Sequence, residues 1–425
     1  MPLGLDLTPL RSSRDLRLLM LGDFVTAIGT QAALVALPFQ IYSLTHSAFL
    51  TGLLGAVELG PLMAMALWGG ALADRSDRRR LLLVVQAGLV VGASALAAVT
   101  LAGSPPVPVL FVLAGVMAGF GAFQNVVAGA IVPNLVAAEN LRGALALAFG
   151  MHNLTMVIGP AVGGVLIGAL GVASAYVLDA ASCLAMVGAA FALSSQLPRG
   201  GGERDGESEP LGVLSSIAEG LRFVRGNRAL MGSFVIDLCA MTFGMPRALF
   251  PVLAVSVYHA GAAGTGAMFA AVSAGAAVAA LTASWLPRVR RLGRIVIAAV
   301  IVWGGAIAVA GLASTIYLAV AMLAVAGAAD SVSAVCRSSI NQMVTPDAMR
   351  GRMSSVFSVV VTSGPRLGDV EAGSVAALAG VRASVVSGGL ACIAGVGLTV
   401  LAFPALAAFD AERDAVGAQP ALALQ

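Results

Sequence analysis

A ten-residue motif that occurs twice decides the architecture of this chain. Asn134-Leu-Val-Ala-Ala-Glu-Asn-Leu-Arg-Gly143 and Gln342-Met-Val-Thr-Pro-Asp-Ala-Met-Arg-Gly351 align without gaps at an offset of 208 residues. Each copy joins the end of one apolar run to the start of the next. A second pair of related motifs follows, Gly159-Pro-Ala-Val-Gly-Gly164 and Gly364-Pro-Arg-Leu-Gly-Asp369. This internal repeat predicts two halves with the same topology.

The apolar runs are long enough to cross a lipid bilayer. Of the 425 residues 59% are hydrophobic and 11% are charged, and the mean hydropathy is +0.95. A soluble domain carries about 25% charged residues, so we predict an integral membrane protein. The first run is too long for a cleaved signal peptide and is taken as the first span. At about 20 apolar residues per crossing, the predicted spans are 16–42, 48–73, 81–102, 107–136, 143–170, 172–194, 231–258, 264–287, 292–313, 314–344, 353–379 and 381–408.

The spans divide into two groups at a polar linker. The predicted fold is an all-α membrane protein with twelve transmembrane helices in two pseudo-symmetric six-helix halves. Gly200–Pro210 is polar and rich in glycine and glutamate, and apolar residues recur at helical spacing after it, which predicts an amphipathic helix in the cytoplasmic interface. The predicted domains are an N-terminal bundle 1–194, a linker 195–230, a C-terminal bundle 231–408 and a cytoplasmic tail 409–425.

The positions of the basic residues predict the topology. All 24 are arginine; with both termini cytoplasmic, 20 fall on the cytoplasmic side, three lie within spans, and only Arg382 lies outside. This satisfies the positive-inside rule and predicts a multi-pass protein of the cell (inner or plasma) membrane. The net charge of +3 follows from that topology and does not indicate nucleic-acid binding. The four cysteines lie singly within spans without metal-ligand spacing, so we predict no metal site and no cofactor.

A basic loop between the second and third spans carries a family motif. It reads Gly69-Gly-Ala-Leu-Ala-Asp-Arg-Ser-Asp-Arg-Arg-Arg80 and resembles the signature loop of the major facilitator superfamily, departing from it at Asp77, where glycine is usual. The resemblance implies that Asp74 meets the cytoplasmic end of the eleventh span and latches the outward-facing state. The alternative is a loop that only fixes the topology. The predicted latch residues are Gly70, Asp74, Arg75, Arg78 and Arg79.

Further stretches resemble one branch of the superfamily, which contains enterobactin exporters and drug and macrolide efflux proteins. These stretches are 36–47, 139–141 and 345–351. The motif in the fifth span resembles part of the signature of proton-driven antiporters, although Thr155 stands where that signature has a glycine. Its residues are Gly159, Pro160, Gly163 and Gly164. The resemblance implies export, while close packing of small residues is the other interpretation of the fifth-span motif.

Charged residues at membrane depth are the candidates for mechanism. Arg247, Arg337 and Arg366 lie inside apolar runs, where an ionised side chain normally faces a bundle interior or a watery cavity. If all of these residues and the accompanying acids were ionised, the spans would hold a net charge of −4. Burial favours neutral carboxyl groups, so some acids are candidate proton carriers. The acids are Asp23, Glu58, Asp179, Asp237, Asp330, Asp369 and Glu371.

Helical spacing narrows the roles of these groups. Asp330 and Arg337 share a face of the tenth span, and Arg366 and Asp369 can pair along the eleventh, while Glu371 points elsewhere. We predict proton coupling or structural ion pairs at Asp330, Arg337, Asp369 and Glu371. Asp23 and Asp237 lie near cytoplasmic ends, where snorkelling or capping is an equal explanation, and His152 suits packing better than proton relay. The predicted substrate pathway comprises Glu58, Gln124, Asn125, Arg247 and Arg366; Arg247 follows Pro246, which predicts a helix break beside a cavity.

Together these features predict a transporter rather than an enzyme. The predicted function is proton-driven export of a small solute by alternating access, with a siderophore or related secondary metabolite as the first candidate and drug or macrolide efflux as the second. Uptake by symport and a non-transporting membrane sensor are the remaining alternatives. No nucleotide-binding loop is present, which argues against direct ATP drive. The predicted partners are the solute, protons and lipid, and the protein is predicted to be monomeric.

Overall fold

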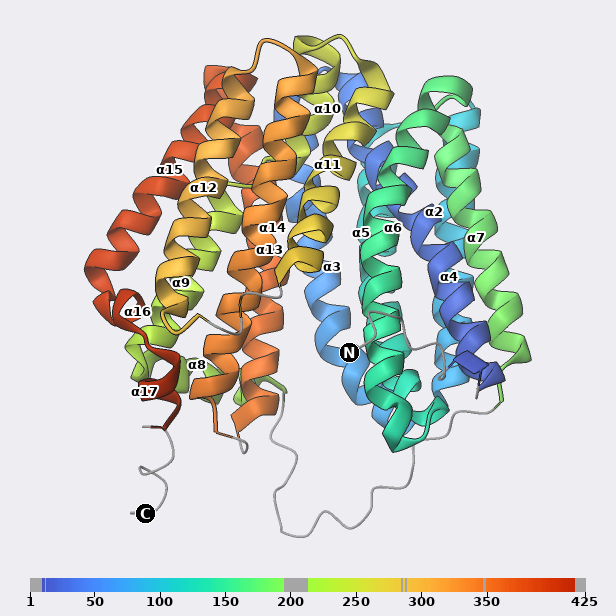
Figure 1. The fold of residues 1–425 in the computed structure, drawn as a ribbon. Coiled ribbons are helices and arrows are strands. Elements are labelled where there is room, and N and C mark those ends of the chain that lie inside the picture. Colours follow the sequence, from blue (N-terminus) through green and yellow to red (C-terminus); the bar gives the residue numbers. More distant parts are fainter. Residues whose placement is uncertain are drawn as a thin grey trace. The chain divides into compact units, whose positions relative to one another are not determined.

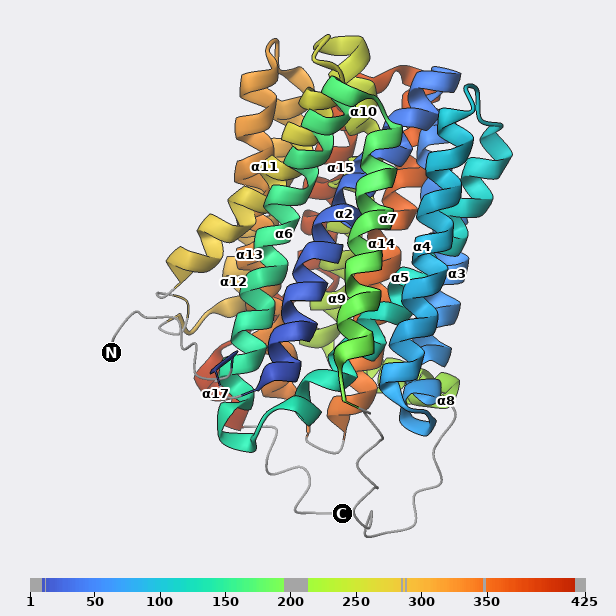
Figure 2. The ribbon, with the colours of Figure 1, turned by 90° about the vertical axis from the view of Figure 1, so that its right-hand side faces the viewer.

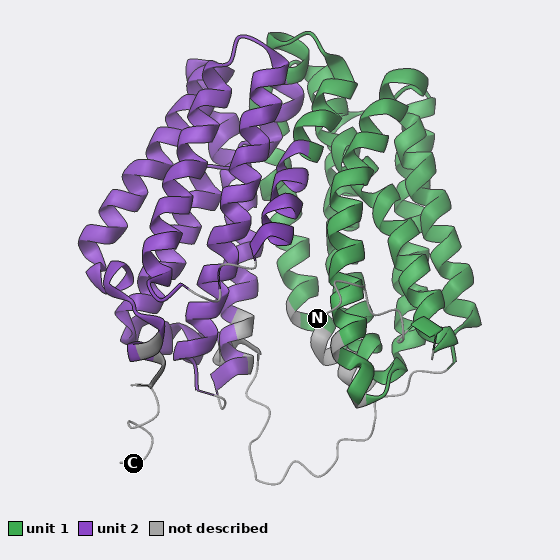
Figure 3. Cartoon of the chain, viewed as in Figure 1, with its two compact units in different colours: residues 1–207, 254–270 green, residues 208–253, 271–425 purple. Residues whose placement is uncertain are grey.

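The structure is a computed structural model that describes residues 10–11, 13–194, 213–283, 286, 289–346 and 349–416. Every regular element among these residues is helical, and they contain no strand. The chain forms two compact units, coloured green and purple in Figure 3: residues 1–207 with 254–270, and residues 208–253 with 271–425.

Unit 1 contains the helices of the first half. They are α2 (Arg14–Thr45), α3 (Ala48–Arg75), α4 (Arg78–Leu101), α5 (Val107–Leu135), the 3₁₀ turn η1 (Ala138–Asn140), α6 (Leu141–Leu170) and α7 (Ala173–Ala192). In Figures 1 and 2, α2 lies beside α6 and α7, and α3 packs on α5. Apolar side chains of α2, α4, α5, α6 and α7 form the core, with Leu16, Leu82, Val127 and Met186 fully buried within it.

Unit 2 contains the remaining helices, apart from residues 254–270, in η3 and the start of α11, which belong to unit 1. Within unit 2, α9 packs on α14 and α15, and α12 packs on α13 and α15. The elements after the linker are α8 (Val213–Gly226), α9 (Arg228–Phe243), η2 (Arg247–Leu249), α10 (Phe250–Val252), the π-helix η3 (Leu253–Val257), α11 (Gly261–Thr282), α12 (Leu292–Leu312), α13 (Ile316–Val344), α14 (Arg350–Ala379), α15 (Val381–Ala402), α16 (Pro404–Ala408) and α17 (Ala411–Val416).

The helical class is confirmed, whereas the count of twelve spans is not. Eleven helical segments among the described residues are long and apolar enough to cross a membrane. The predicted eleventh span is a helix of 30 residues, α14, but it is not among the eleven. Its sequence contains Arg366, Asp369 and Glu371, which lower its hydropathy. The last predicted span ran to residue 408, but α15 ends at Ala402, and α16 begins at Pro404 after a break.

Short polar residues set where several helices begin. The hydroxyls of Ser13, Ser47 and Thr315 accept hydrogen bonds from the backbone amides three residues later, and the Asn227 side chain accepts from two amides of α9. These caps satisfy amides that have no partner inside the helix. Asp77, the residue that departs from the family loop, caps α4 by accepting from the Arg79 amide at 2.9 Å. A glycine there would lack this carboxylate.

Candidate functional site

The seventh predicted span is broken where the sequence places two prolines. Regular helix α9 ends at Phe243, and the chain continues through η2, α10 and η3 rather than as one α-helix. The break leaves backbone groups unpaired, and in a membrane these need partners from the protein. Trp303 provides one: its indole Nε1 donates to the carbonyl oxygen of Gly244 at 2.8 Å. The predicted helix break is therefore present, and Arg247 is the first residue of η2.

The carboxylate of Asp369, on α14, binds the backbone on the C-terminal side of this break. Its Oδ1 accepts a hydrogen bond from the backbone amide of Ala248 at 3.0 Å. Its Oδ2 lies 3.9 Å from the guanidinium of Arg366, three residues earlier on α14. Arg247 also interacts electrostatically with Asp369. The pair predicted from helical spacing is thus formed, and its acid also binds the backbone at the break.

Arg337 lies between two carboxylates. It is buried on α13 and forms an ion pair with buried Asp237 of α9. Its second guanidinium nitrogen lies 3.8 Å from Asp330, two turns earlier on the same helix. Asp330 in turn interacts electrostatically with Arg247. Sequence spacing identified Asp330 as the partner of Arg337 and left the role of Asp237 open between proton carriage and capping or snorkelling. Only the packing of α9 near α13 shows that Asp237 is the closer acid.

Three ion pairs, together with the electrostatic interactions of Arg247, link six side chains of unit 2 into one alternating series of charges, which we call the charge network. Its three arginines and three aspartates balance when all six are ionised. The network links α9, η2, α13 and α14, and an uncompensated buried charge costs far more than a paired one. In order along the network its members are Asp237, Arg337, Asp330, Arg247, Asp369 and Arg366.

The acids outside the charge network lie mostly in unit 1. Glu371 is on α14, and the described residues form no ion pair with it; Asp23, Glu58 and Asp179 belong to unit 1. Asp179 is fully buried on α7, where the Thr30 hydroxyl of α2 donates to its Oδ1 at 3.0 Å. Its Oδ2 accepts no hydrogen bond from the described residues. The excess of negative charge predicted from the sequence is therefore concentrated in the first half.

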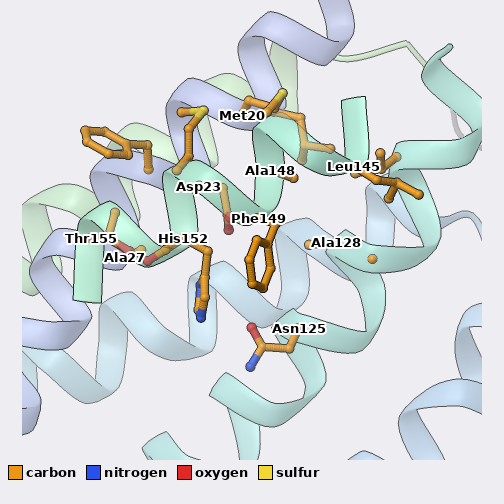
Figure 4. A pocket seen from close by; sticks show the side chains of 15 residues that line it. Met20, Asp23, Ala27, Asn125, Ala128, Leu145, Ala148, Phe149, His152 and Thr155 are labelled. Atoms are coloured by element: carbon orange, nitrogen blue, oxygen red, sulfur yellow. Dashed lines mark hydrogen bonds between the residues drawn. The ribbon is translucent and has the colours of Figure 1, made fainter. Parts of the chain in front are cut away.

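A pocket of about 320 Å³ lies within unit 1 between α2, α5 and α6. In Figure 4 the side chains of Asp23, Asn125, Phe149 and His152 extend into the same space. Most of the other lining is apolar. The residues that line this pocket, which we call the first-half pocket, are Leu19, Met20, Asp23, Phe24, Ala27, Asn125, Ala128, Gly129, Val132, Leu145, Ala148, Phe149, Met151, His152 and Thr155.

The polar groups of the first-half pocket interact with one another across helices and with the backbone of α6. The amide of Gln124, on α5, donates to Asp23 Oδ1 of α2 at 3.4 Å. His152 of α6 interacts electrostatically with Asp23, and the Thr155 hydroxyl donates to the His152 carbonyl at 2.7 Å. Of the predicted pathway residues in the first half, Asn125 lines the pocket and Gln124 supports it. Buried Glu58, on α3, does not line it.

The arginines of the predicted latch loop bind helix carbonyls inside unit 1. Arg78 donates to the Ala130 carbonyl of α5 at 2.9 Å. Arg79 donates to Ala190 and Phe191, at the end of α7, at 3.0 and 2.6 Å. These bonds join the start of α4 to its two neighbours, α5 and α7. The side chains at the other latch positions, Gly70, Asp74 and Arg75, lie outside those that the structure describes.

The glycines of the fifth-span motif lie at close helix contacts within unit 1. A Cβ added to Gly163 would lie 2.8 Å from the Ala32 Cα of α2, and one added to Gly164 would lie 2.9 Å from the Ala262 carbonyl oxygen and the Gly266 Cα. An added Cβ at Gly159 would meet the Gln31 side chain, and Pro160 lies inside α6. In the second copy, Gly368 lies similarly close to the Met241 carbonyl of α9.

Comparison with known proteins identifies the family. A model of the family described as transmembrane secretion effector matches residues 5–425. The chain belongs to this family. It is 29% identical over 398 residues to an enterobactin exporter, EntS, of Citrobacter koseri, covering 93% of this chain and 92% of the relative. It is 30% identical over 380 residues to EntS of Shigella boydii, covering 88% of each.

Solved structures support the same fold. The nucleoside transporter NupG matches with a TM-score of 0.72 at 14% identity, covering 93% of this chain and 99% of that one. A peptide transporter, POT, matches with a TM-score of 0.72 at 13% identity, covering 94% and 96%. At these identities the likeness shows the fold alone. With the family match, it makes the protein a multi-pass inner-membrane transporter of the major facilitator superfamily and not an enzyme.

Proposed function

We propose that this transporter exports a small iron-chelating molecule of the siderophore class in exchange for protons, by alternating access of its two halves. The relatives named enterobactin exporters cover nearly the whole chain and support the solute class. The solved relatives include peptide and nucleoside transporters and do not fix the direction of transport. Export of drugs or macrolides is the second candidate, as the branch resemblance allows.

The observation that carries the proposal is the position of Arg247 in the charge network. This arginine lies at a helix break and interacts with both Asp330 and Asp369. Guanidinium groups bind the oxygens of carboxylates, catecholates and hydroxamates by two parallel hydrogen bonds. Protonation of either aspartate would leave the network with one positive charge in excess and weaken its hold on Arg247. One residue can therefore connect proton binding with solute binding.

Proton coupling through these two acids is tested with conservative variants. We expect Asp330→Asn and Asp369→Asn, each tested alone in everted vesicles, to lower siderophore-driven proton movement by about tenfold or more, because a carboxamide cannot take up and release the transported proton. The assay records a pH-sensitive dye in the vesicle lumen after siderophore addition. Asp414→Asn is the matched control, because Asp414 pairs with Arg413 at 2.9 Å in the tail and lies outside the membrane segments. Normal coupling in both network variants would exclude these acids as proton carriers.

The latch is tested at Asp74. Since Arg78 and Arg79 bind carbonyls of unit 1, we propose that Asp74 is the loop residue whose charge acts on the conformational equilibrium, as the superfamily resemblance implies. Asp74→Asn should impair export and reduce the outward-facing population measured by spin-label distances, without changing membrane insertion. Arg80→Gln, in the same loop, is the control for charge alone. If the distance distribution is unchanged in Asp74→Asn, the loop acts only in topology.

A further inference from the structure

The first-half pocket differs in charge from the charge network of unit 2. The described residues that line it include one carboxylate, one imidazole, one carboxamide and one hydroxyl, and no arginine. Among the described residues the polar neighbours of Asp23 are the Gln124 amide and His152, and no arginine pairs with it. Each aspartate of the charge network, by contrast, has at least one arginine partner. The pocket therefore disfavours an anion and offers a hydrogen-bond acceptor.

We infer that the first-half pocket binds the protonated, iron-free chelating group of the solute, a phenol, catechol or hydroxamic acid, and rejects the iron complex. This inference rests on the proposed function and names the form of the solute that is carried. In the iron-free form the chelating oxygens carry hydrogens that can be donated to Asp23. Iron binding removes those hydrogens, occupies the oxygens and leaves them with negative charge.

The shape and lining of the pocket fit one arm of such a molecule. The apolar side chains of Met20, Phe24 and Phe149 provide surface for an aromatic or aliphatic group beside Asp23. Pockets for whole drug-sized ligands are about 300–1,000 Å³. At about 320 Å³ the first-half pocket is near the lower limit, which suits one chelating group rather than a metal-bound cluster of them.

The same arrangement makes proton and solute compete. Asp23 accepts two strong hydrogen bonds from a catechol only while it is ionised, because a protonated carboxyl group has become a donor itself. Solute binding and proton binding at this residue therefore exclude each other, as an antiporter requires. Among the described residues, His152 of α6 is the titratable group that interacts with Asp23. The other helices packed on α2 carry Asp179 of α7, which accepts a hydrogen bond from Thr30 two turns from Asp23, and Glu58 of α3.

Binding of a small probe tests the pocket without relying on transport. We would titrate the purified full chain in nanodiscs with 2,3-dihydroxybenzamide and with its dimethyl ether, which keeps the ring and loses both donors. The wild type should bind the dihydroxy compound tenfold or more tightly than the ether, as expected for hydrogen bonds to a charged acceptor. Asp23→Asn should lose most of that difference. Asp15→Asn, an acid on the same helix whose carboxylate accepts from the Ser194 amide, should keep it.

Three further outcomes decide the inference. Ala128→Phe fills the pocket from α5 and should abolish binding of both probes. If Asp23→Asn does not fold, this second variant still tests whether the probes bind in the pocket. Binding should weaken as pH falls, and His152→Gln should keep that dependence; its loss there would assign the competition to His152 and overturn the role of Asp23. Equal binding of the dihydroxy compound and the ether by the wild type, or an unchanged preference in Asp23→Asn, also overturns the inference.

Transport separates this inference from the proposed function. Vesicles would be given a catechol siderophore either iron-free or loaded with Ga³⁺, a redox-inert substitute for Fe³⁺. Export of the iron-free form alone supports both proposals. Equal export of both forms overturns the pocket inference and leaves siderophore export intact. Export of neither form, with normal binding of the dihydroxy probe, overturns siderophore export and retains the pocket.

Discussion

Replacing Arg337 with glutamine should lower the free energy of unfolding by about 3–5 kcal/mol, the usual cost of removing one partner from a buried ion pair. Arg337 is buried against Asp237, which is itself almost inaccessible, and it also faces Asp330. Without the arginine, two aspartates remain near each other without their shared cation. The thermal unfolding midpoint in detergent should fall by roughly 6–20 °C, given the 2–4 °C per kcal/mol of a domain of this size.

A surface ion pair in the same unit provides the control. Arg352 of α14 lies 2.8 Å from Glu219 of α8, and both side chains are about one-third exposed, at 35% and 31%. Exposed pairs contribute about 0–1 kcal/mol, so Arg352→Gln should shift the midpoint by only a few degrees. The double variant Asp237→Leu, Arg337→Leu should recover part of the loss, because an apolar pair replaces a buried charge. Equal shifts for Arg337→Gln and Arg352→Gln would show that the buried pair has no special role.

Removing Arg247 should have the largest effect on transport. Arg247→Gln keeps hydrogen-bond donors but removes the charge that interacts with Asp330 and Asp369, so the charge network retains an excess negative charge. We expect siderophore export to fall by at least about tenfold, corresponding to the loss of one charge-assisted hydrogen bond of 1.5–3 kcal/mol. Arg366→Gln should reduce export less, because Arg366 meets Asp369 only at 3.9 Å. Export of the siderophore and of a cationic dye would be measured side by side.

The comparison between the two solutes distinguishes recognition from folding. If the arginines bind solute oxygens, dye efflux should survive in both variants while siderophore export falls. If both activities fall together with the unfolding midpoint, the arginines are structural members of the bundle. Ser363→Ala, a change on α14 that removes a hydroxyl bound only to carbonyls of its own helix, controls for substitution within this helix.

Much of the fold follows from local patterns that the sequence contains. The apolar runs predicted nearly all helix boundaries, because a segment in lipid has to satisfy its own backbone and does so as a helix. The break at Arg247 was predictable, since Pro246 and Pro251 lack the amide hydrogens that a helix needs. The pairing of Arg366 with Asp369 followed from a spacing of three residues, which places both on one helix face. In each case the cause and its effect lie within one helix.

Contacts between helices could not be predicted from the sequence in the same way. Asp237 and Arg337 are 100 positions apart in the sequence, and spacing carries no information about which faces of α9 and α13 meet. The capping of α4 by Asp77 was not predicted either. An aspartate directly before a helix is a recognised capping signal, but Asp77 was interpreted only as a departure from the family motif. Arg78 and Arg79, two of the predicted latch residues, bind carbonyls of α5 and α7, and the sequence does not show these contacts either.

The sequence by itself therefore determined that the chain lies in a membrane, that it is helical, that its two halves repeat, and which charged residues lie within the spans. These properties depend on composition and on periodicity within single helices. The tertiary structure decided which charges balance one another: six of them form a neutral network in unit 2, while Asp23 faces a pocket whose described lining contains no arginine. Coulomb energies depend on distances of a few ångströms between side chains of different helices. Those distances are set by packing, and packing is a property of the whole folded unit.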